Sequence, residues 1–303
     1  MAAGMANDLA TTALLATDKP VVVAPAMNPM MWSHPATQSN IATLKTRGVS
    51  FIGPNAGDMA CGEEGAGRLS EPDEIVTQVL DHLRASQSLS GKKVLITAGP
   101  TRESIDPVRY ISNHSSGKQG YAIAEAFVQA GADVTLVSGP TRLAPPTGLN
   151  LVPIQSADDM LAACNQALPA DVAIFAAAVA DWKVANPADQ KIKKKGKKKP
   201  TLTFEDNPDI AATIGKMKKG RPALVIGFAA ETEDLLAHAK AKLKKKGCDW
   251  IMANDVSPSS GTFGGDASEL HLVTPKGSES WGHQSKQATA QQLVAAVAKE
   301  LKG

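Results

Sequence analysis

Short apolar runs alternate with longer amphipathic segments along most of this chain, and this alternation constrains the fold more than any other feature. After residue 90 the apolar runs are KVLITAGPT, ADVTLVSG, VAIFAAAVAD, ALVIGFAAE, CDWIMAND and ELHLVTP. Helical patterns separate them at about residues 117–131, 156–168, 208–218 and 233–246, and a last helix begins near residue 286. Parallel strands that helices cover on both faces have this pattern. We therefore predict an α/β fold with a doubly wound, mostly parallel Rossmann-like sheet, whose ligands bind outside the carboxyl ends of the strands.

A polar stretch without apolar periodicity, ASQSLSGKK (residues 85–93), is the best candidate for a linker. We predict a first domain over residues 1–89 and a second over residues 90–303. In the first, VVVAPAMN (21–28) and VSFIGP (49–54) are predicted strands with a helix between them, and DEIVTQVLDHLRAS is a closing helix. Two strands and three helices are expected there, which is about half of a Rossmann-like domain.

Positive charge is concentrated in one segment, KIKKKGKKKP (191–200), which holds seven lysines. The whole chain has 32 Lys and Arg against 30 Asp and Glu, so without these seven lysines 25 basic residues face 30 acidic ones. A general nucleic-acid binder distributes its basic residues over a surface that contacts many phosphates. We therefore expect no nucleic-acid partner.

The apolar and cysteine patterns favour a cytoplasmic protein with no membrane partner. The longest apolar stretches fall far short of the roughly 20 residues that a membrane span needs. The N-terminal MAAGMANDLATTALLATDKP lacks the basic start of a signal peptide and has Asp8 in its apolar part, so we predict a helix there. Cys61, Cys164 and Cys248 are odd in number and include no CxxC pair, which argues against a disulfide framework or a zinc site.

The loop after the first strand of the second domain has features of an anion site. Gly99 follows the strand, and Ser115, Ser116 and Gly117 precede a helix whose free N–H groups and positive dipole end attract negative charge. A capped helix behind a long loop is the alternative. The GxGxxG fingerprint and GxxxxGK[ST] are both missing, and the second strand ends in VTLVSGPT without an acidic residue for a ribose. NAD(P) and P-loop chemistry are therefore disfavoured.

The run VAIFAAAVAD ends in small residues that allow a base or sugar to approach the backbone. Asp181 follows at its carboxyl end, where it could hold a ribose hydroxyl or a metal ion. The lysine run begins ten residues later and contains Gly196 and Pro200, so we expect a mobile loop that closes over a triphosphate. A solvated loop is the alternative.

A second set of lysines lies on the predicted helix ETEDLLAHAKAKLKKKG. At 100° per residue, the buried stripe is predicted to contain Leu236, Ala239 and Leu243. Lys242 and Lys246 are four residues apart along its edge and are expected to project toward the protein. The neighbouring Lys244 and Lys245 are expected to point outward. Edge lysines also lie along apolar surfaces without binding anything, which is the alternative here.

Together these motifs resemble a known family. TAGPTRE, ISNHSSGKQG, AAVADW, KIKK, NPDI, GFAAET and ANDVS occur in this order. They are similar to the ligase half of the bacterial bifunctional phosphopantothenoylcysteine decarboxylase/phosphopantothenate-cysteine ligases. The resemblance implies an enzyme of coenzyme A biosynthesis that uses CTP and Mg²⁺ (or Mn²⁺) to convert the carboxylate of 4′-phosphopantothenate to an acyl-cytidylate. The amine of L-cysteine then attacks and CMP leaves. Homodimers formed through the ligase domain are also implied.

The resemblance assigns roles to residues of the second domain. Lys191 is implied to contact the triphosphate and to promote cytidylylation, Asn113 to handle the acyl-cytidylate, and Arg109 to contact substrate. Further residues are implied to surround CTP: Asp181, Asn207, Pro208, Asp209, Ile210, Phe228, Lys242 and Lys246. Lys197, Lys198 and Lys199 are not part of the motif and are expected to be solvated. No metal ligands are assigned.

In the first region, PVVVAPAMNPMMW and GDMACGEEGAGRLSEP resemble the later part of the family's FMN-dependent decarboxylase domain. The resemblance implies that Asn28 binds the substrate carboxylate. It also implies that Cys61, beside Gly62 and Gly65 in a mobile lid, donates a proton. The family's first flavin-binding loops and its catalytic histidine precede the segment that this chain matches, so we expect this chain alone neither to bind FMN well nor to decarboxylate. The alternatives are an NAD(P)-binding oxidoreductase and a non-enzymatic regulator that binds a nucleotide or flavin.

Overall fold

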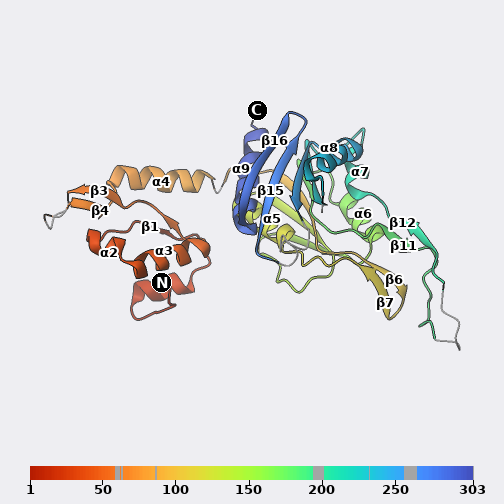
Figure 1. Ribbon diagram of the computed structural model, residues 1–303, viewed down its shortest axis with the longest axis horizontal. Helices are drawn as coiled ribbons and strands as arrows, with labels where there is room; N and C mark the ends of the chain where they lie inside the picture. The colour runs from red at the N-terminus through yellow and green to blue at the C-terminus, as the bar shows by residue number, and fades with distance from the viewer. Residues whose placement is uncertain are drawn as a thin grey trace. The chain divides into compact units, whose positions relative to one another are not determined.

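The computed structural model describes residues 1–58, 62, 64–85, 87–193, 201–231, 233–255 and 265–302. The chain divides into two compact units, Met1–Ala85 and Ser86–Gly303 (Figure 1). Leu89 is only 1% exposed and belongs to the hydrophobic core of the second unit.

The first unit contains more elements than the sequence predicts. Its helices are α1 (Leu9–Ala16), α2 (Pro29–Ser33), α3 (Pro35–Thr46) and α4 (Pro72–Ala85). Its strands form two small sheets, β1 (Val22–Val23) parallel to β2 (Ser50–Phe51), and β3 (Asn55–Asp58) antiparallel to β4 (Glu64–Arg68). The N-terminal helix is confirmed as α1, and Asp8 caps it by accepting a hydrogen bond from the Thr11 backbone N–H at 2.8 Å.

One prediction in this unit needs correction. The expected strand over residues 21–28 is paired only at Val22 and Val23, and its partner β2 is equally short. Gly65, which is expected to belong to a lid beside Cys61, lies in β4 and pairs with Gly57 across the β3–β4 hairpin. Ile52 is 4% exposed, whereas apolar side chains such as Leu9 and Met30 are exposed by 86% and 74%. The described part of this unit therefore encloses little apolar volume.

The second unit is built on an eight-stranded sheet in the order β16-β15-β14-β13-β10-β5-β8-β9. Its strands are β5 (Lys93–Ala98), β8 (Asp133–Ser138), β9 (Asn150–Pro153), β10 (Val172–Phe175), β13 (Leu224–Glu231), β14 (Trp250–Asp255), β15 (Ala267–Thr274) and β16 (Gly277–Ser285). In this sheet, neighbouring strands from β14 through β13, β10, β5 and β8 to β9 pair in parallel. β15 pairs antiparallel with β14, and β16 pairs antiparallel with β15. The chain starts at β5, builds outward to β9, then returns to β10 and builds the other side. The doubly wound prediction is confirmed, and the direction of winding reverses between β5 and β10.

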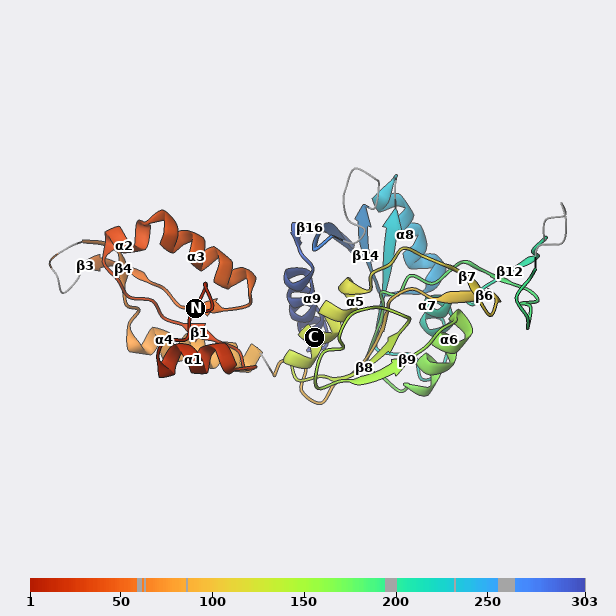
Figure 2. The same cartoon turned by 90° about the horizontal axis from the view of Figure 1, so that it is seen from below.

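Helices cover both faces of this sheet (Figure 2). One face carries α5 (Lys118–Gln129) and α9 (Lys286–Glu300), and the other carries α6 (Ala157–Gln166), α7 (Ile210–Gly215) and α8 (Leu235–Lys246). Two apolar clusters fill the spaces between helices and sheet, one on each face. Among the residues described, no helix combines the length and apolar character needed to cross a bilayer.

Two antiparallel hairpins lie beyond the sheet and were not predicted. They are β6 (Arg102–Asp106) with β7 (Arg109–Ser112), and β11 (Trp182–Val184) with β12 (Phe204–Asp206). Strands β6 and β11 contact each other, and both figures place the two hairpins at the same end of this unit. The first follows β5 and the second follows β10, so both belong to the loops that leave the switch point.

Candidate functional site

The loops that leave β5 and β10 remain side by side after the strands end. The Ala178 N–H donates to the Gly99 carbonyl at 2.9 Å, and the Thr101 N–H donates to the Ala178 carbonyl at 3.3 Å. Gly139, after β8, packs so closely on this loop that an added Cβ would lie 1.8 Å from the Pro100 carbonyl oxygen. Backbone contacts therefore fix the position of both loops at the carboxyl edge of the sheet.

Asn113 is held against the loop after β10. Its Nδ2 donates to the carbonyl oxygens of Ala178 and Val179, each at 3.1 Å, although the residue is exposed. No described residue donates a hydrogen bond to its Oδ1. An amide fixed in this way presents an oxygen acceptor to a ligand at the switch point.

Thr101 connects the β6–β7 hairpin to the same loop. Its carbonyl accepts from the Ser112 hydroxyl at 2.6 Å, and its own hydroxyl accepts from the Ala180 N–H at 3.0 Å. Thr101 is fully buried. A movement of Thr101 would therefore displace both β7, through Ser112, and the loop after β10, through Ala180.

Asp181 and Asn207 lie together beyond the end of β10. The Asn207 N–H donates to the Asp181 carbonyl at 2.9 Å, and Asn207 Nδ2 donates to the Ala180 carbonyl at 2.8 Å. The Asp181 side chain is exposed, as a ligand contact requires. Asn207 Oδ1 is buried and has no donor among the described residues. A buried acceptor without a donor costs about 1–3 kcal/mol, so a ligand that supplies a donor would be stabilised there.

The lysines of α8 divide as the helix geometry predicts. Lys242 and Lys246 are partly buried, whereas Lys244 and Lys245 are exposed. Lys246 Nζ lies 3.2 Å from Asp209 Oδ1, and Lys242 Nζ lies 2.6 Å from a carboxylate oxygen of Glu231 at the end of β13.

The predicted buried stripe of α8 is partly wrong. Leu236 is 37% exposed, whereas Ala239 and Leu243 are buried as expected. Leu235, four and eight residues before those two, occupies the inward position and packs on the core of this face. Leu236 is rotated by about 100° from Leu235 and therefore lies away from the sheet.

The NPDI motif forms the start of α7. Asp209 caps this helix by accepting from the Ala212 N–H at 3.0 Å, and Pro208 precedes it. Ile210 is 4% exposed and packs in the core, so its side chain is not available to a ligand. Phe228, in β13, is partly buried against the core cluster on the opposite face of the sheet from α7 and α8. Its ring is therefore not on the same face as the pair formed by Asp209 and Lys246.

Arg109 is engaged within the protein. Its guanidinium forms an ion pair with Asp106 and donates to the Ile192 carbonyl at 2.9 Å. Hydrogen bonding to Arg109 holds the pKa of the Asp106 carboxyl far below its ordinary value, and the backbone N–H groups of Ile192, Val108 and Arg109 add to the effect. The contact with Ile192 places the exposed Lys191 beside the β6–β7 hairpin. Lys197, Lys198 and Lys199 lie outside the described residues.

The two candidate residues of the first unit have different outcomes. Asn28 caps α2, because its Oδ1 accepts from the Met30 N–H at 2.8 Å. Cys61 lies outside the described residues.

Three residues of the site were not singled out from the sequence: Thr101, Asp106 and Glu231. A signal for Asp106 was present, since Asp-Pro-Val-Arg (106–109) has aspartate and proline in the first two positions that a tight turn prefers. Thr101 and Glu231 left no comparable signal, because their partners come from other segments of the chain: Ser112 and Ala180 for Thr101, and Lys242 on α8 for Glu231.

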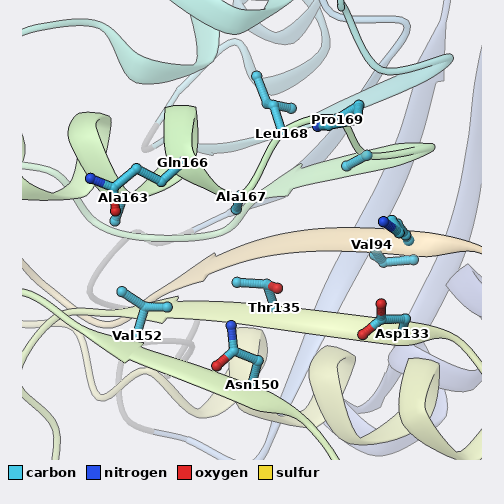
Figure 3. Close-up of a pocket in the computed structure, with 12 residues that line it drawn as sticks. Val94, Asp133, Thr135, Asn150, Val152, Ala163, Gln166, Ala167, Leu168 and Pro169 are labelled. Carbon is cyan, nitrogen blue, oxygen red and sulfur yellow. The ribbon is translucent and has the colours of Figure 1, made fainter.

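A cavity of about 360 Å³ lies at the opposite edge of the sheet, where β5, β8 and β9 begin. Figure 3 shows Asp133, Thr135 and Asn150 from the strands on one side, and Gln166 and Leu168 from the end of α6 and the following loop on the other. Ligands of open α/β sheets bind at the carboxyl ends of strands, so this cavity is separate from the candidate site. Among the described residues, no group of three or more His, Cys, Asp or Glu side chains is placed to hold a metal ion.

Comparison with known proteins divides the chain between two families. Residues 89–301 match the DNA/pantothenate metabolism flavoprotein C-terminal domain, and residues 1–84 match the family named Flavoprotein. The chain is 48% identical over 292 residues to the coenzyme A biosynthesis bifunctional protein CoaBC of Haemophilus influenzae, covering 96% of this chain and 72% of that protein. It is 44% identical over 297 residues to CoaBC of Escherichia coli K12, covering 97% of this chain and 73% of that protein. A crystal structure of the C-terminal domain of a CoaBC protein is 39% identical with a TM-score of 0.60, and the match covers 72% of this chain and 99% of that one.

Proposed function

The chain belongs to the CoaBC family of coenzyme A biosynthesis bifunctional proteins, and on this premise we propose that its second unit activates 4′-phosphopantothenate with CTP and joins it to L-cysteine. The family assigns a phosphopantothenate-cysteine ligase to this unit and the decarboxylase part to the first unit. The nucleotide, the metal and the residue roles are our proposal.

One observation carries the proposal. The loops after β5 and β10 hold Asn113, Asp181 and Asn207 around the switch point. The β6–β7 hairpin extends from the same loop, and its turn holds the start of the lysine run through Arg109 and Ile192. Lysines neutralise a triphosphate and amide groups bind neutral polar atoms, so the arrangement suits a nucleotide and an uncharged acyl group.

Two displacements complete the reaction. An oxygen of the phosphopantothenate carboxylate attacks the α-phosphorus of CTP, the bond to the β-phosphate breaks, and pyrophosphate leaves. The amine nitrogen of cysteine then attacks the acyl carbon, the bond between that carbon and the bridging oxygen breaks, and CMP leaves with this oxygen. The amine loses one proton to solvent.

Charge neutralisation is the main contribution of the protein to the first step. A carboxylate and a triphosphate repel each other, and cations placed beforehand reduce the repulsion without reorganising during the reaction. We assign this role to Lys191, with Lys242 and Lys246 on the nucleotide. Asn113 is assigned to the acyl-cytidylate, where its fixed amide orients the intermediate for attack. Arg109 is assigned to substrate only through its exposed portion, since its guanidinium is already bonded to Asp106 and Ile192.

Asn207 supports a preference for CTP over UTP. Its buried Oδ1 lacks a donor among the described residues, and the exocyclic amino group of cytosine is a donor where uracil has a carbonyl acceptor. A site built around a hydrogen bond discriminates strongly against an analogue that lacks the matching group. The backbone of Pro208, Asp209 and Ile210 is proposed as the remaining nucleotide contact, whereas the ring of Phe228 packs on the opposite face of the sheet and is given no role here.

The donor set around Asp181 fits Mg²⁺ that arrives with the nucleotide. Mg²⁺ is usually held by one or two carboxylates together with substrate phosphates and water, and the Asp181 carboxylate is exposed at the proposed triphosphate site. The ion would neutralise phosphate charge. The remaining steps depend on the lysines and amides already named.

We propose that FMN belongs to the decarboxylase part of the family, which the first unit matches. FMN has no part in the ligase steps proposed here.

We propose that the ligase unit forms a homodimer. The β6–β7 and β11–β12 hairpins expose Val108 (59%), Tyr110 (50%), Trp182 (58%) and Phe204 (53%). Apolar side chains gathered on neighbouring hairpins are typical of a protein interface. A cytoplasmic location is proposed because Cys164 and Cys248 are free thiols.

The test is pyrophosphate release with each of the four nucleoside triphosphates, in the presence of 4′-phosphopantothenate, L-cysteine and Mg²⁺. Release is expected with CTP, and omission of phosphopantothenate should abolish it. Equal release with UTP would contradict the role given to Asn207. No release with any nucleotide from folded protein would contradict the proposed function and favour a binding protein.

A further inference from the structure

The backbone of Ile192 is held at both of its polar atoms. Its N–H donates to Asp106 Oδ2 at 3.1 Å, and its carbonyl accepts from the Arg109 guanidinium at 2.9 Å. Asp106 and Arg109 are also bonded to each other, through Arg109 Nε to Asp106 Oδ2 at 3.0 Å and through a second guanidinium nitrogen. A closed ring of hydrogen bonds therefore joins the Ile192 N–H, the Asp106 carboxylate, the Arg109 guanidinium and the Ile192 carbonyl. We call this ring the Ile192 grip.

Asp106 is built into the fold at this position. Its side chain is fully buried, and its other oxygen, Oδ1, accepts from the N–H groups of Val108 and Arg109 at 2.9 Å each. The carboxylate therefore closes the turn between β6 and β7 with one oxygen and holds Ile192 with the other. A buried carboxylate that uses both oxygens on the protein has no contact to give a substrate.

The grip acts on the segment that starts the lysine run. A further hydrogen bond, from the Ala188 N–H to the Ile105 carbonyl at 3.0 Å, ties the approach to this segment to β6. Ile192 is partly buried, whereas Lys191 and Lys193 on either side are exposed. Holding the backbone between two exposed lysines limits where their ammonium groups can reach and removes backbone freedom before a ligand binds.

We propose that Asp106 is a positioning residue of the ligase, which fixes Lys191 for its task by holding the backbone of Ile192 jointly with Arg109. This inference rests on the proposed function of Lys191 and deepens it. It also gives Arg109 a role that does not require contact with substrate.

Asp106→Asn is the sharpest substitution. If the remaining oxygen stays with the N–H groups of Val108 and Arg109, the new NH₂ group faces two donors, the Ile192 N–H and the guanidinium. The turn is preserved and the grip is lost. Asp158→Asn is the matched control, because Asp158 pairs with Lys183 at 2.5 Å in the same unit and touches none of the residues of the grip.

The first measurement does not depend on activity. Hydrogen exchange of the peptide containing residues 188–193 is followed in the full chain, with equal global stability confirmed by denaturant unfolding. Asp106→Asn is expected to accelerate exchange of this peptide at least tenfold, and Asp158→Asn to leave it unchanged. Unchanged exchange in Asp106→Asn would overturn the inference even if the protein has no ligase activity.

The second measurement is a double-mutant cycle with Lys191→Gln, read as the rate of pyrophosphate release with CTP and phosphopantothenate. Asp106→Asn alone is expected to lower kcat roughly 10- to 100-fold with little change in KM for cysteine, as displacement of a catalytic group does. In the Lys191→Gln background it should cause no further loss, because the residue it positions is already gone. Full additivity would show that Asp106 acts elsewhere. If wild-type protein releases no pyrophosphate while the exchange result holds, the proposed function fails and the grip remains only a structural feature, which also overturns the assigned role.

Discussion

Gly139→Ala tests how closely the packing behind the site controls its geometry. The added Cβ would lie 1.8 Å from the Pro100 carbonyl oxygen and 2.8 Å from its carbon, whereas real Cβ contacts stay above 3.0 Å. The oxygen must therefore retreat by at least about 1.2 Å. Pro100 is bonded directly to Thr101, whose hydrogen bonds hold Ser112 and Ala180, so the displacement reaches both loops of the site.

Two effects should follow. Overpacking at this buried position is expected to lower the free energy of unfolding by about 1–3 kcal/mol. A displacement of this size in a site that depends on alignment is expected to lower kcat for pyrophosphate release roughly 100-fold. Denaturant unfolding and steady-state kinetics with CTP, phosphopantothenate and cysteine measure the two effects separately.

Gly91→Ala is the control. Gly91 has a φ of +74° and no atom within 4 Å of an added Cβ, so alanine there costs about 1–2 kcal/mol of backbone strain without displacing a neighbour. It should lower stability and leave kcat unchanged. A Gly139→Ala protein with wild-type stability and wild-type kcat would refute the reasoning.

The remaining predictions concern charge and thiol chemistry. Lys191→Gln is expected to lower the rate of pyrophosphate release at least 100-fold with unchanged unfolding, because a cation at the reacting phosphate is lost; near-normal turnover would remove its assigned role. Lys246→Gln should raise KM for CTP roughly tenfold while Lys244→Gln, exposed on the same helix, should not, and equal effects would contradict the helix-edge assignment. Burial raises the pKa of the Cys164 thiol to about 12 and that of Cys248 to about 11. Both should stay unmodified by iodoacetamide at pH 8 in native protein and react in denaturant, as peptide mapping would show. Since both folded pKa values exceed the ordinary thiol pKa of 9.0, the free energy of unfolding should be retained below pH 9 and should fall as pH rises above it.

The parallel sheet was predictable because its strands are apolar on both faces. β5, β8, β10, β13 and β14 all appear in the sequence as continuous apolar runs, and the helices between them carry amphipathic patterns. β9 and β16 were missed for the same physical reason. Both are edge strands, and the sequences NLVP and GSESWGHQS contain polar residues and Pro or Gly that a buried strand excludes.

The candidate site was predictable only where a single helix or strand determines the geometry. The partly buried positions of Lys242 and Lys246 follow from helical periodicity alone. The roles of Asp106 and Thr101 depend on contacts between segments far apart in the chain, such as residues 106 and 192, and no local pattern specifies such contacts. Leu236 shows the limit of a prediction from helical periodicity. Leu235 and Leu236 are adjacent, and which of them faces the sheet depends on the rotation of α8 about its axis.

The most direct test of the central claim is the fate of the substrate oxygen. 4′-Phosphopantothenate labelled with ¹⁸O in both carboxylate oxygens is incubated with CTP, cysteine and the enzyme, and the CMP and pyrophosphate are analysed by mass spectrometry. Activation through an acyl-cytidylate predicts one ¹⁸O atom in each CMP and none in pyrophosphate. Unlabelled CMP, with product still formed, would contradict the claim that the lysines of this site direct the carboxylate to the α-phosphate of CTP.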